Sequence, residues 1–352
     1  MSSQTQTVLR FTSPRTGVEC LEARAEPVPE PGRHEVLVKV RSVGLNYRDV
    51  AIATDTYLFP VRENVCPACD MAGEVAALGE GADDGAFRVG DRVTAIVNPT
   101  LLYGFLTDPL SPTWGGPVDG MLREYVVVPA IALIKLPDSK HSLAEWASIV
   151  TTASTVWNAF YGHKALKPGE TVLVLGTGGV SLTALVLAKA AGCTTIVTSS
   201  SDDKLARARR DYGADHTVNY ATQADWSAEV LRLTGGRGAD HVVENGGTGT
   251  IAQSLAAVAY GGVVSVIGFL SRPGPGEPLP DVTMAALGKG CVVRGVLAGS
   301  KEQFEHAVRF VASRSLPVPL DRTFGFGRDE VVEALRYIQA GKHMGKVVIN
   351  FP

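Results

Sequence analysis

The sequence predicts an α/β protein in which a doubly wound, six-stranded parallel sheet accompanies a second, β-rich domain. Six short apolar runs alternate with helical segments between residues 171 and 297, and parallel neighbours need such crossover connections. Segments that alternate apolar and polar residues dominate the first 130 residues and predict the second domain. A last strand, Lys346–Asn350, resembles those segments, so we expect the chain to return to the β-rich domain.

Length and composition suit a globular protein of two domains. The 352 residues exceed one comfortable hydrophobic core, and 45% of them are hydrophobic and 20% charged. We place one domain in residues 1–152 together with 298–352 and the other in residues 153–297. A formal net charge of −3 gives no electrostatic reason to expect binding to nucleic acid or to an anionic membrane.

The sequence carries no pattern that predicts membrane insertion or export. No apolar run approaches the roughly 20 residues that span a bilayer. Residues 1–7 are polar and lack the apolar region of a signal peptide. Five cysteines, an odd number at irregular spacings, do not indicate a disulfide framework. We therefore expect a cytoplasmic protein without a membrane partner.

The β-rich domain contains recognisable strands and one long loop. Residues 35–43 alternate as a strand does, and residues 89–97 predict a turn followed by a strand. Residues 98–120 are rich in proline, glycine and aromatic residues without a period, which predicts a long loop. Ser142 and Glu145 form a capping box that opens a short helix, and a second helix is predicted through 156–166.

The six predicted strands of the parallel sheet occur at regular intervals. They are expected near residues 171–175, 194–198, 216–219, 240–244, 262–267 and 292–297. Gly192 and Gly213 fall where the intervening helices should end. Two more helices are predicted near 300–314 and 328–340, before the last strand.

A glycine turn follows the first strand of the sheet. Gly176, Gly178 and Ser181 fit the spacing G-x-G-x-x-G, with a small serine at the third position. Such a turn lets backbone N–H groups and a helix N-terminus approach a pyrophosphate. Taken alone the turn could be a plain strand–turn–helix. The five strand–helix units that follow favour a dinucleotide-binding domain of the Rossmann type.

The end of the second strand predicts which dinucleotide is bound. NAD-binding domains place an acidic residue there for the ribose 2′-OH, whereas residues 198–201 are Thr-Ser-Ser-Ser. Ser199 and Ser200 could donate hydrogen bonds to a 2′-phosphate, and Lys204 could add a positive charge. Alternatively, Ser201 and Asp202 cap the next helix and Lys204 is solvated. Phosphate binding and helix capping can both occur in this segment. We expect the cofactor to be NADP(H).

Nine segments in the same order resemble the medium-chain dehydrogenase/reductase superfamily, and within it the zinc-independent quinone oxidoreductase and enoyl reductase branch. They are Val43–Asp49, Asp70–Val75, Val89–Val93, Gly120–Tyr125, Ala153–Trp157, Lys167–Glu170, Gly176–Val180, Gly213–Tyr220 and Gly345–Lys346. The resemblance implies a GroES-like catalytic domain and a Rossmann cofactor domain. It also implies a homodimer in which the last strand of the parallel sheet pairs with its copy.

The same resemblance addresses the metal content. Zinc alcohol dehydrogenases of this superfamily bind catalytic zinc through a cysteine, a histidine with a glutamate neighbour, and a further cysteine. The matching positions here are Asn46, Cys69 with Asp70, and Thr151, which cannot readily form the three-ligand open site. We therefore expect no metal. Cys66 and Cys69 could be packed thiols or a redox-sensitive pair.

Catalytic residues are implied by position. The resemblance places Asn46 at the substrate face of the nicotinamide. Tyr47 and Arg48 are candidates for stabilising an oxyanion or delivering a proton, because both are donors at neutral pH. The alternatives are that Tyr47 fills the core and that Arg48 pairs with Asp49. Tyr57 could also supply the catalytic tyrosine that enoyl reductases carry nearby.

The resemblance further implies a set of cofactor contacts. Thr155 lies beside the nicotinamide in this interpretation, and Lys346 reaches back toward the cofactor. The remaining contacts are Gly178, Gly179 and Val180 at the pyrophosphate, Ser199, Ser200, Lys204 and Tyr220 at the adenosine phosphate, and Asn245, Gly246, Gly268, Phe269 and Leu270 along the far side of the cofactor.

These expectations converge on a reductase that uses NADP(H). Its substrate would be a small hydrophobic quinone or α,β-unsaturated carbonyl compound, which accepts a hydride without metal activation. An alcohol or aldehyde dehydrogenase without zinc is one alternative. A non-catalytic cofactor-binding protein similar to a crystallin is another.

Overall fold

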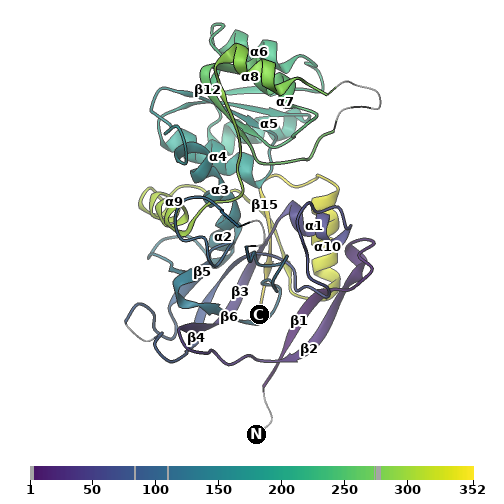
Figure 1. Cartoon of the computed structure of the whole chain (residues 1–352), viewed down its shortest axis with the longest axis vertical. Helices are drawn as coiled ribbons and strands as arrows, with labels where there is room; N and C mark the ends of the chain where they lie inside the picture. The colour runs from purple at the N-terminus through teal and green to yellow at the C-terminus, as the bar shows by residue number, and fades with distance from the viewer. Residues whose placement is uncertain (1–3, 83–84, 109–110, 273, 275–278) are drawn as a thin grey trace. The chain divides into compact units, whose positions relative to one another are not determined.

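The computed structural model describes residues 4–352 except 83–84, 109–110, 273 and 275–278. The chain forms two compact units (Figure 1). The first comprises the residues up to Ser154 together with Gly299–Pro352, and the second comprises Thr155–Ala298. No described helix combines the length and the apolar character that crossing a bilayer requires.

The second unit contains the predicted six-stranded parallel sheet. Its strands are β8 (Thr171–Leu175), β9 (Thr194–Ser199), β10 (His216–Asn219), β11 (Ala239–Glu244), β12 (Val258–Val266) and β13 (Val292–Gly295), in the order β10-β9-β8-β11-β12-β13. The chain therefore builds outward from β8 in one direction and from β11 in the other. This reversal creates a switch point between β8 and β11, where doubly wound sheets bind ligands at the carboxyl ends of their strands.

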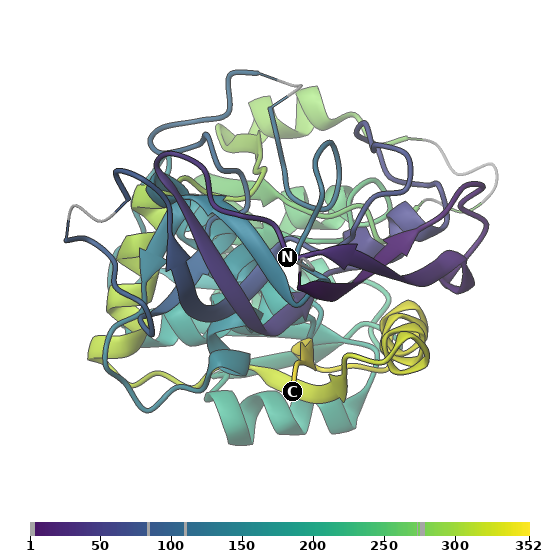
Figure 2. The ribbon, with the colours of Figure 1, turned by 90° about the horizontal axis from the view of Figure 1, so that it is seen from below.

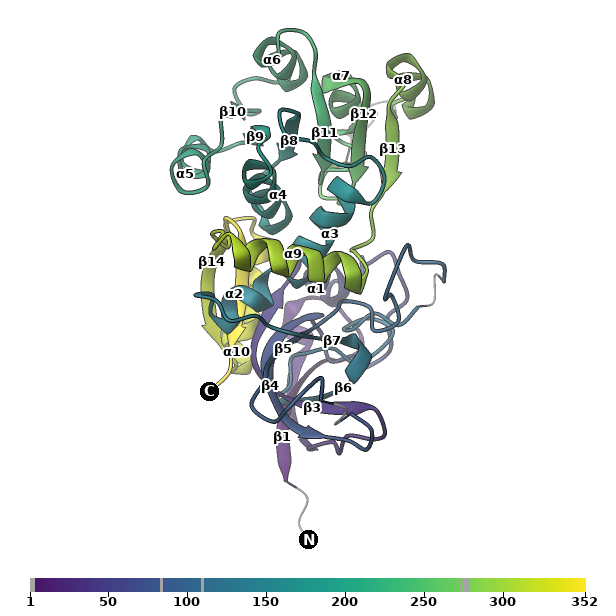
Figure 3. The ribbon, with the colours of Figure 1, turned by 90° about the vertical axis from the view of Figure 1, so that its left-hand side faces the viewer.

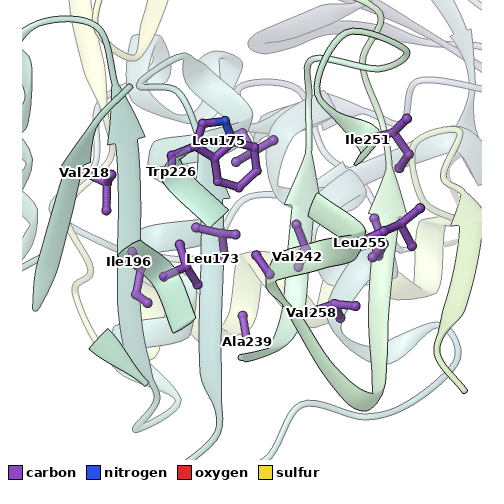
Figure 4. Close-up of a cluster of buried hydrophobic side chains, with 13 residues drawn as sticks. Leu173, Leu175, Ile196, Val218, Trp226, Ala239, Val242, Ile251, Leu255 and Val258 are labelled. Carbon is purple, nitrogen blue, oxygen red and sulfur yellow. The ribbon is translucent and has the colours of Figure 1, made fainter. Parts of the chain in front are cut away.

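Helices cover both faces of this sheet. They are α4 (Gly179–Ala190), α5 (Asp202–Tyr212), α6 (Trp226–Leu233), α7 (Ile251–Ala257) and α8 (Val282–Lys289). Figure 3 shows α4 and α5 on one face and α6, α7 and α8 on the other. Leu173, Ile196 and Val242 of the strands pack with Trp226 of α6 and Leu255 of α7 in a buried cluster (Figure 4). The cluster holds β8 against its neighbours, and the glycine turn follows the carboxyl end of β8.

The first unit contains a seven-stranded sheet and a two-stranded sheet. The seven strands are β3 (Glu35–Leu45), β4 (Asp70–Leu78), β5 (Arg92–Ala95), β6 (Tyr125–Pro129), β7 (Leu133–Lys135), β14 (Leu320–Gly325) and β15 (Lys346–Asn350). Strand β15 pairs antiparallel with β3, which confirms the predicted return of the chain. Strands β1 (Thr5–Phe11) and β2 (Leu21–Pro27) form the smaller sheet, so both chain ends contribute to this unit (Figure 2).

The helices of the first unit begin with α1 (Tyr47–Ala53), α2 (Leu143–Ser148) and α3 (Val150–Tyr161), which continues into the second unit. The capping box is confirmed, because Ser142 Oγ accepts the Glu145 N–H at 3.2 Å and a Glu145 oxygen accepts the Ser142 N–H at 2.8 Å. The prediction of a helix extending to residue 166 is wrong. Helix α3 ends before Gly162, whose missing side chain leaves room for the carbonyl and amide oxygens of Asn158.

The predicted long loop, residues 98–120, contains no helix or strand among its described residues. Side-chain hydrogen bonds order it instead: Asn98 Nδ2 donates to Ser111 Oγ at 2.7 Å, and Trp114 Nε1 donates to the Ile96 carbonyl at 3.0 Å. The carbonyls of residues 101 and 102 accept the first N–H groups of α9 (Lys301–Ser313) at 2.9 and 3.1 Å. The loop thus helps to cap α9, which precedes the last helix, α10 (Arg328–Gln339).

Candidate active site

A buried ion pair lies at the centre of the candidate site in the first unit. Lys346 Nζ is 3.3 Å from Asp70 Oδ2, and neither side chain is more than 5% exposed. The same ammonium donates to Asn46 Oδ1 at 2.7 Å and to the Leu45 carbonyl at 2.6 Å. All three of its protons therefore have acceptors, as a buried ammonium requires.

Three elements of the sheet bring these residues together. Strand β3 ends at Leu45, and α1 begins immediately after Asn46, whose backbone N–H donates to Asp49 Oδ2 at 2.8 Å. Strand β15 pairs with β3 in a register that places Lys346 next to this junction, since Val347 lies opposite Leu45. Strand β4 begins with Asp70 opposite Gly44 on the other side of β3. Gly44 is required here, because a Cβ would collide with the Ala147 carbonyl of α2.

The three positions that match zinc ligands in relatives are close together. Cys69 Sγ lies 3.7 Å from Asn46 Nδ2 and 3.4 Å from Thr151 Oγ1. Asp70 accepts from all three: Asn46 Nδ2 at 3.0 Å, the Cys69 thiol at 3.2 Å, and the Thr151 hydroxyl. These donors satisfy one another through hydrogen bonds.

This donor set does not fit catalytic zinc. Burial raises the pKa of Cys69 to about 12, so the thiol stays protonated, whereas zinc binds the thiolate. The Asp70 carboxylate is occupied by the Lys346 ammonium. Within the described part of the chain, no group of three His, Cys, Asp or Glu residues could hold a metal ion.

The Arg48 side chain lies against the Tyr57 ring and is held by a hydrogen bond to the backbone. Its Nη1 donates to the Trp114 carbonyl at 2.8 Å, and its guanidinium carbon lies 5.2 Å from the centre of the Tyr57 ring. Its Nε and Nη2 atoms are buried and find no hydrogen-bond partner among the described residues. The alternative ion pair with Asp49 does not form; Asp49 instead accepts from Asn46. Arg48 is thus placed to act on Tyr57.

The two tyrosines differ in their surroundings. Tyr47 is 44% exposed, so it does not fill the core as the alternative interpretation required. Tyr57 is half-buried between the Arg48 guanidinium and the ring of Phe59, whose centre is 5.5 Å away. Burial raises the pKa of Tyr57, and the phenol therefore keeps its proton at neutral pH.

The glycine turn of the second unit is shaped to accept a pyrophosphate. Gly176 adopts φ 81°, which favours glycine, and α4 has no side-chain cap at its N-terminus. A Cβ on Gly178 would meet nothing within 4 Å, so the space in front of the turn is open. Ser181 Oγ donates to the Leu175 carbonyl at 2.7 Å, and Asn245 Nδ2 donates to Ser181 Oγ at 3.0 Å. This local geometry can accept a dinucleotide, and Gly178, Gly179 and Val180 stay its predicted phosphate contacts.

The end of β9 combines a helix cap with the exposed hydroxyl of Ser200, whereas the predicted contact Ser199 is buried. Ser201 Oγ accepts the Lys204 N–H at 3.4 Å, which confirms the capping interpretation for Ser201. Ser199 Oγ accepts the Ser201 N–H at 3.3 Å, and the Ser199 carbonyl accepts the Tyr220 N–H at 3.0 Å. Ser200 is exposed. This segment thus brings Ser199, Ser200, Lys204 and Tyr220 to one sheet edge without a carboxylate at residues 198–200.

The carboxyl ends of β11 and β12 carry the remaining predicted contacts in this unit. Gly268 packs against the backbone of Asn245, where a Cβ would collide with the carbonyl oxygen, while Phe269 and Leu270 are exposed. Thr155, at the start of the second unit, is buried, and Lys346 belongs to the ion pair of the first unit.

Glu244, the last residue of β11, is 0% exposed and was not among the predicted site residues. Its signal was an acidic residue at the end of an otherwise apolar strand.

Comparison with known proteins agrees with both units. The family described as "Alcohol dehydrogenase GroES-like domain" matches residues 32–138, and the family described as "Zinc-binding dehydrogenase" matches residues 179–313. The chain belongs to the medium-chain dehydrogenase/reductase superfamily. Members of this superfamily are oxidoreductases that bind a nicotinamide cofactor, so the Rossmann-type and GroES-like folds have their expected role here.

Individual members of the superfamily cover nearly the whole chain. A zinc-type alcohol dehydrogenase-like protein of Schizosaccharomyces pombe is 38% identical, over 95% of this chain and 96% of its own. Prostaglandin reductase-3 of Bos taurus is 30% identical, over 93% and 84%. A solved structure described as an NAD-dependent alcohol dehydrogenase is 33% identical, with a TM-score of 0.85 over 98% and 99% of the two chains.

Proposed function

We propose that this protein is a zinc-independent, NADP(H)-dependent reductase of quinones or α,β-unsaturated carbonyl compounds. The observation that carries the proposal is the hydrogen-bonded network of Asn46, Cys69, Asp70 and Thr151 at the positions that match zinc ligands. The Lys346 ammonium pairs with the Asp70 carboxylate of this network. Without a metal, hydrogen bonds must polarise a carbonyl, and hydride transfer is easier for compounds that already present an activated electrophilic carbon. Quinones and conjugated carbonyl compounds do so.

The residues of the first unit supply the proton chemistry. The bound cofactor supplies the hydride. The Tyr57 phenol, which stays protonated, donates a hydrogen bond to the substrate oxygen as negative charge develops there. Arg48 holds the Tyr57 ring and adds positive charge beside it. Asn46 is oriented by Lys346 on its amide oxygen and by Asp70 on its amide nitrogen, so it forms a fixed wall of the site.

The preference for NADP(H) rests on the end of β9. The exposed Ser200 and the nearby Lys204 would bind the 2′-phosphate, and no carboxylate at residues 198–200 would repel it. The similar solved structure at 33% identity is described as NAD-dependent, so turnover with NADPH must be compared with turnover with NADH. We expect kcat/KM with NADPH to exceed that with NADH at least tenfold. S200D should reverse the preference, and the exposed Lys342→Met should leave it unchanged.

The substrate class is tested by following NADPH oxidation with a panel of quinones, enones, aldehydes and ketones. The proposal predicts turnover with quinones or enones, unchanged by a chelator. Turnover confined to aldehydes or ketones would instead support the alternative of an alcohol or aldehyde dehydrogenase that works without zinc. Tight NADPH binding without turnover on any compound would support the non-catalytic alternative.

We also propose that the protein forms a homodimer through the second unit. Strand β13 is an edge of the six-stranded sheet, and α8 beside it has no buried residue. Leu287 of α8 is 73% exposed and Tyr260 on β12 is 79% exposed. Unprotected apolar sheet edges favour pairing with another strand. Light scattering should give twice the chain mass, and L287E should shift the population toward monomer.

A further inference from the structure

Glu244 is a buried carboxylate at the carboxyl end of β11. Its Oε1 accepts three hydrogen bonds, from the N–H groups of Gly246 and Gly247 at 2.7 and 2.9 Å and from Thr250 Oγ1 at 2.6 Å. Its Oε2 accepts from the Ser254 hydroxyl of α7. The side chain is 0% exposed, so these donors replace water completely.

The donor set suits a carboxylate. Three donors converge on Oε1, and the Ser254 hydroxyl lies within hydrogen-bond distance of Oε2, so both oxygens of the side chain are engaged. No ion pair to Glu244 occurs within the described part of the chain, so its negative charge is solvated by neutral dipoles. Such a charge acts on its surroundings with little cancellation.

The topology places this charge on one half of the cofactor site. Glu244 lies opposite Val266 of β12, and the preceding residue pairs with Val174 of β8, two residues before the glycine turn. A dinucleotide with its pyrophosphate at the turn and its adenosine half at the end of β9 would leave the other side of the switch point to its nicotinamide half. That side is formed by the carboxyl ends of β11 and β12, where Glu244 and its loop lie.

We propose that Glu244 tunes the reduction potential of the bound nicotinamide cofactor. When NADPH gives up a hydride, two electrons and one proton leave together and the neutral dihydronicotinamide becomes a cationic ring. A fixed negative charge nearby stabilises the cation and leaves the neutral ring almost unaffected. The charge thus favours NADP⁺ over NADPH in the site and makes bound NADPH a stronger hydride donor. This role rests on the proposed use of NADP(H).

The test compares two dissociation constants in the full-length protein. NADP⁺ and NADPH are each titrated by calorimetry into the unaltered protein and into Glu244→Gln. A charge pair about 10 Å apart at an effective dielectric constant of about 20 corresponds to an effect on the order of tenfold. We expect Kd(NADP⁺)/Kd(NADPH) to rise by about tenfold in Glu244→Gln, which raises the potential of the bound two-electron couple by about 30 mV.

A matched variant separates charge from structure. Ser254→Ala removes one hydrogen-bond donor and keeps the carboxylate, so a change in loop geometry should alter both dissociation constants by the same factor and leave their ratio unchanged. An unchanged ratio in Glu244→Gln, with both cofactors still bound, would overturn the proposal while the proposed function stands. Failure of the unaltered protein to bind either form would instead overturn the proposed use of NADP(H).

A second pair of variants keeps the test decisive if Glu244→Gln does not fold. Phe269 follows the end of β12 and is exposed, so it tolerates a polar side chain. Phe269→Glu and Phe269→Gln differ by one unit charge at the same edge of the sheet. The proposal expects a lower Kd(NADP⁺)/Kd(NADPH) in the glutamate variant than in the glutamine variant. Equal ratios in this pair would contradict the electrostatic mechanism.

Discussion

Replacing Lys346 by methionine removes the ammonium of the buried ion pair while keeping a side chain of similar length. Asp70, which is 0% exposed, then loses its only cation in the described structure. The Leu45 carbonyl and Asn46 Oδ1, at 2.6 and 2.7 Å from Nζ, lose their donor as well. Breaking a buried pair by removing one partner costs about 3–5 kcal/mol of unfolding free energy. For a unit of this size, that corresponds to a fall in Tm of roughly 6–20 °C.

Urea unfolding, followed by circular dichroism, measures this loss directly. The exposed Lys342→Met is the matched control and should change the free energy of unfolding by less than about 0.5 kcal/mol. The double variant Asp70→Asn/Lys346→Met removes both charges and should recover about 2 kcal/mol or more of the loss, because the unpaired carboxylate is gone. A loss below 1 kcal/mol in Lys346→Met would refute the buried pair.

Three further results are expected. Cys69 is buried and its pKa is raised to about 12, so a maleimide or disulfide reagent at pH 8 should modify it only after unfolding; rapid labelling of the native protein would contradict this. Burial lowers the pKa of His241 despite the Glu170 carboxylate 3.4 Å away, so the unfolded chain binds a proton first as pH falls below about 6.5. His241→Gln should therefore lose less stability than the unaltered protein between pH 7 and pH 5, as measured by urea midpoints. Arg48→Met should reduce kcat about tenfold or more. It should also move the alkaline limb of the pH profile of kcat to higher pH, because the Arg48 charge lowers the pKa of Tyr57. An unchanged pH profile would exclude a role of Arg48 in catalysis through Tyr57.

The parallel sheet could be predicted because its strands are short runs bounded by turn residues, and a helical crossover connects each strand to the next. Strand β14 escaped prediction, since its residues are half-buried or exposed and it pairs only with β15. Helix α1 escaped as well, because it is only seven residues long and its last five residues are all buried, which leaves no amphipathic period. Its local signal is the capping box of Asn46 and Asp49, whereas β14 depends on its pairing with β15.

The candidate site was predictable in its chemistry and less so in its connections. The residues at the positions that match zinc ligands were identified from their motifs, and the structure brings Asn46, Cys69 and Thr151 together. The partner of Asp70 could not be predicted, because Lys346 is 276 residues away along the chain and no local pattern encodes their pairing. Glu244 was missed for a related reason, since an acidic residue at a strand end is usually solvated.

The proposed function requires that the protein reduces its substrate without a metal. This requirement is tested by the zinc content of the purified, active protein, measured together with its NADPH-dependent turnover of a quinone or enone after dialysis against a chelator. We expect well below one zinc per chain and undiminished turnover. One tightly bound zinc per chain, with activity that is lost on chelation and restored by zinc, would contradict it.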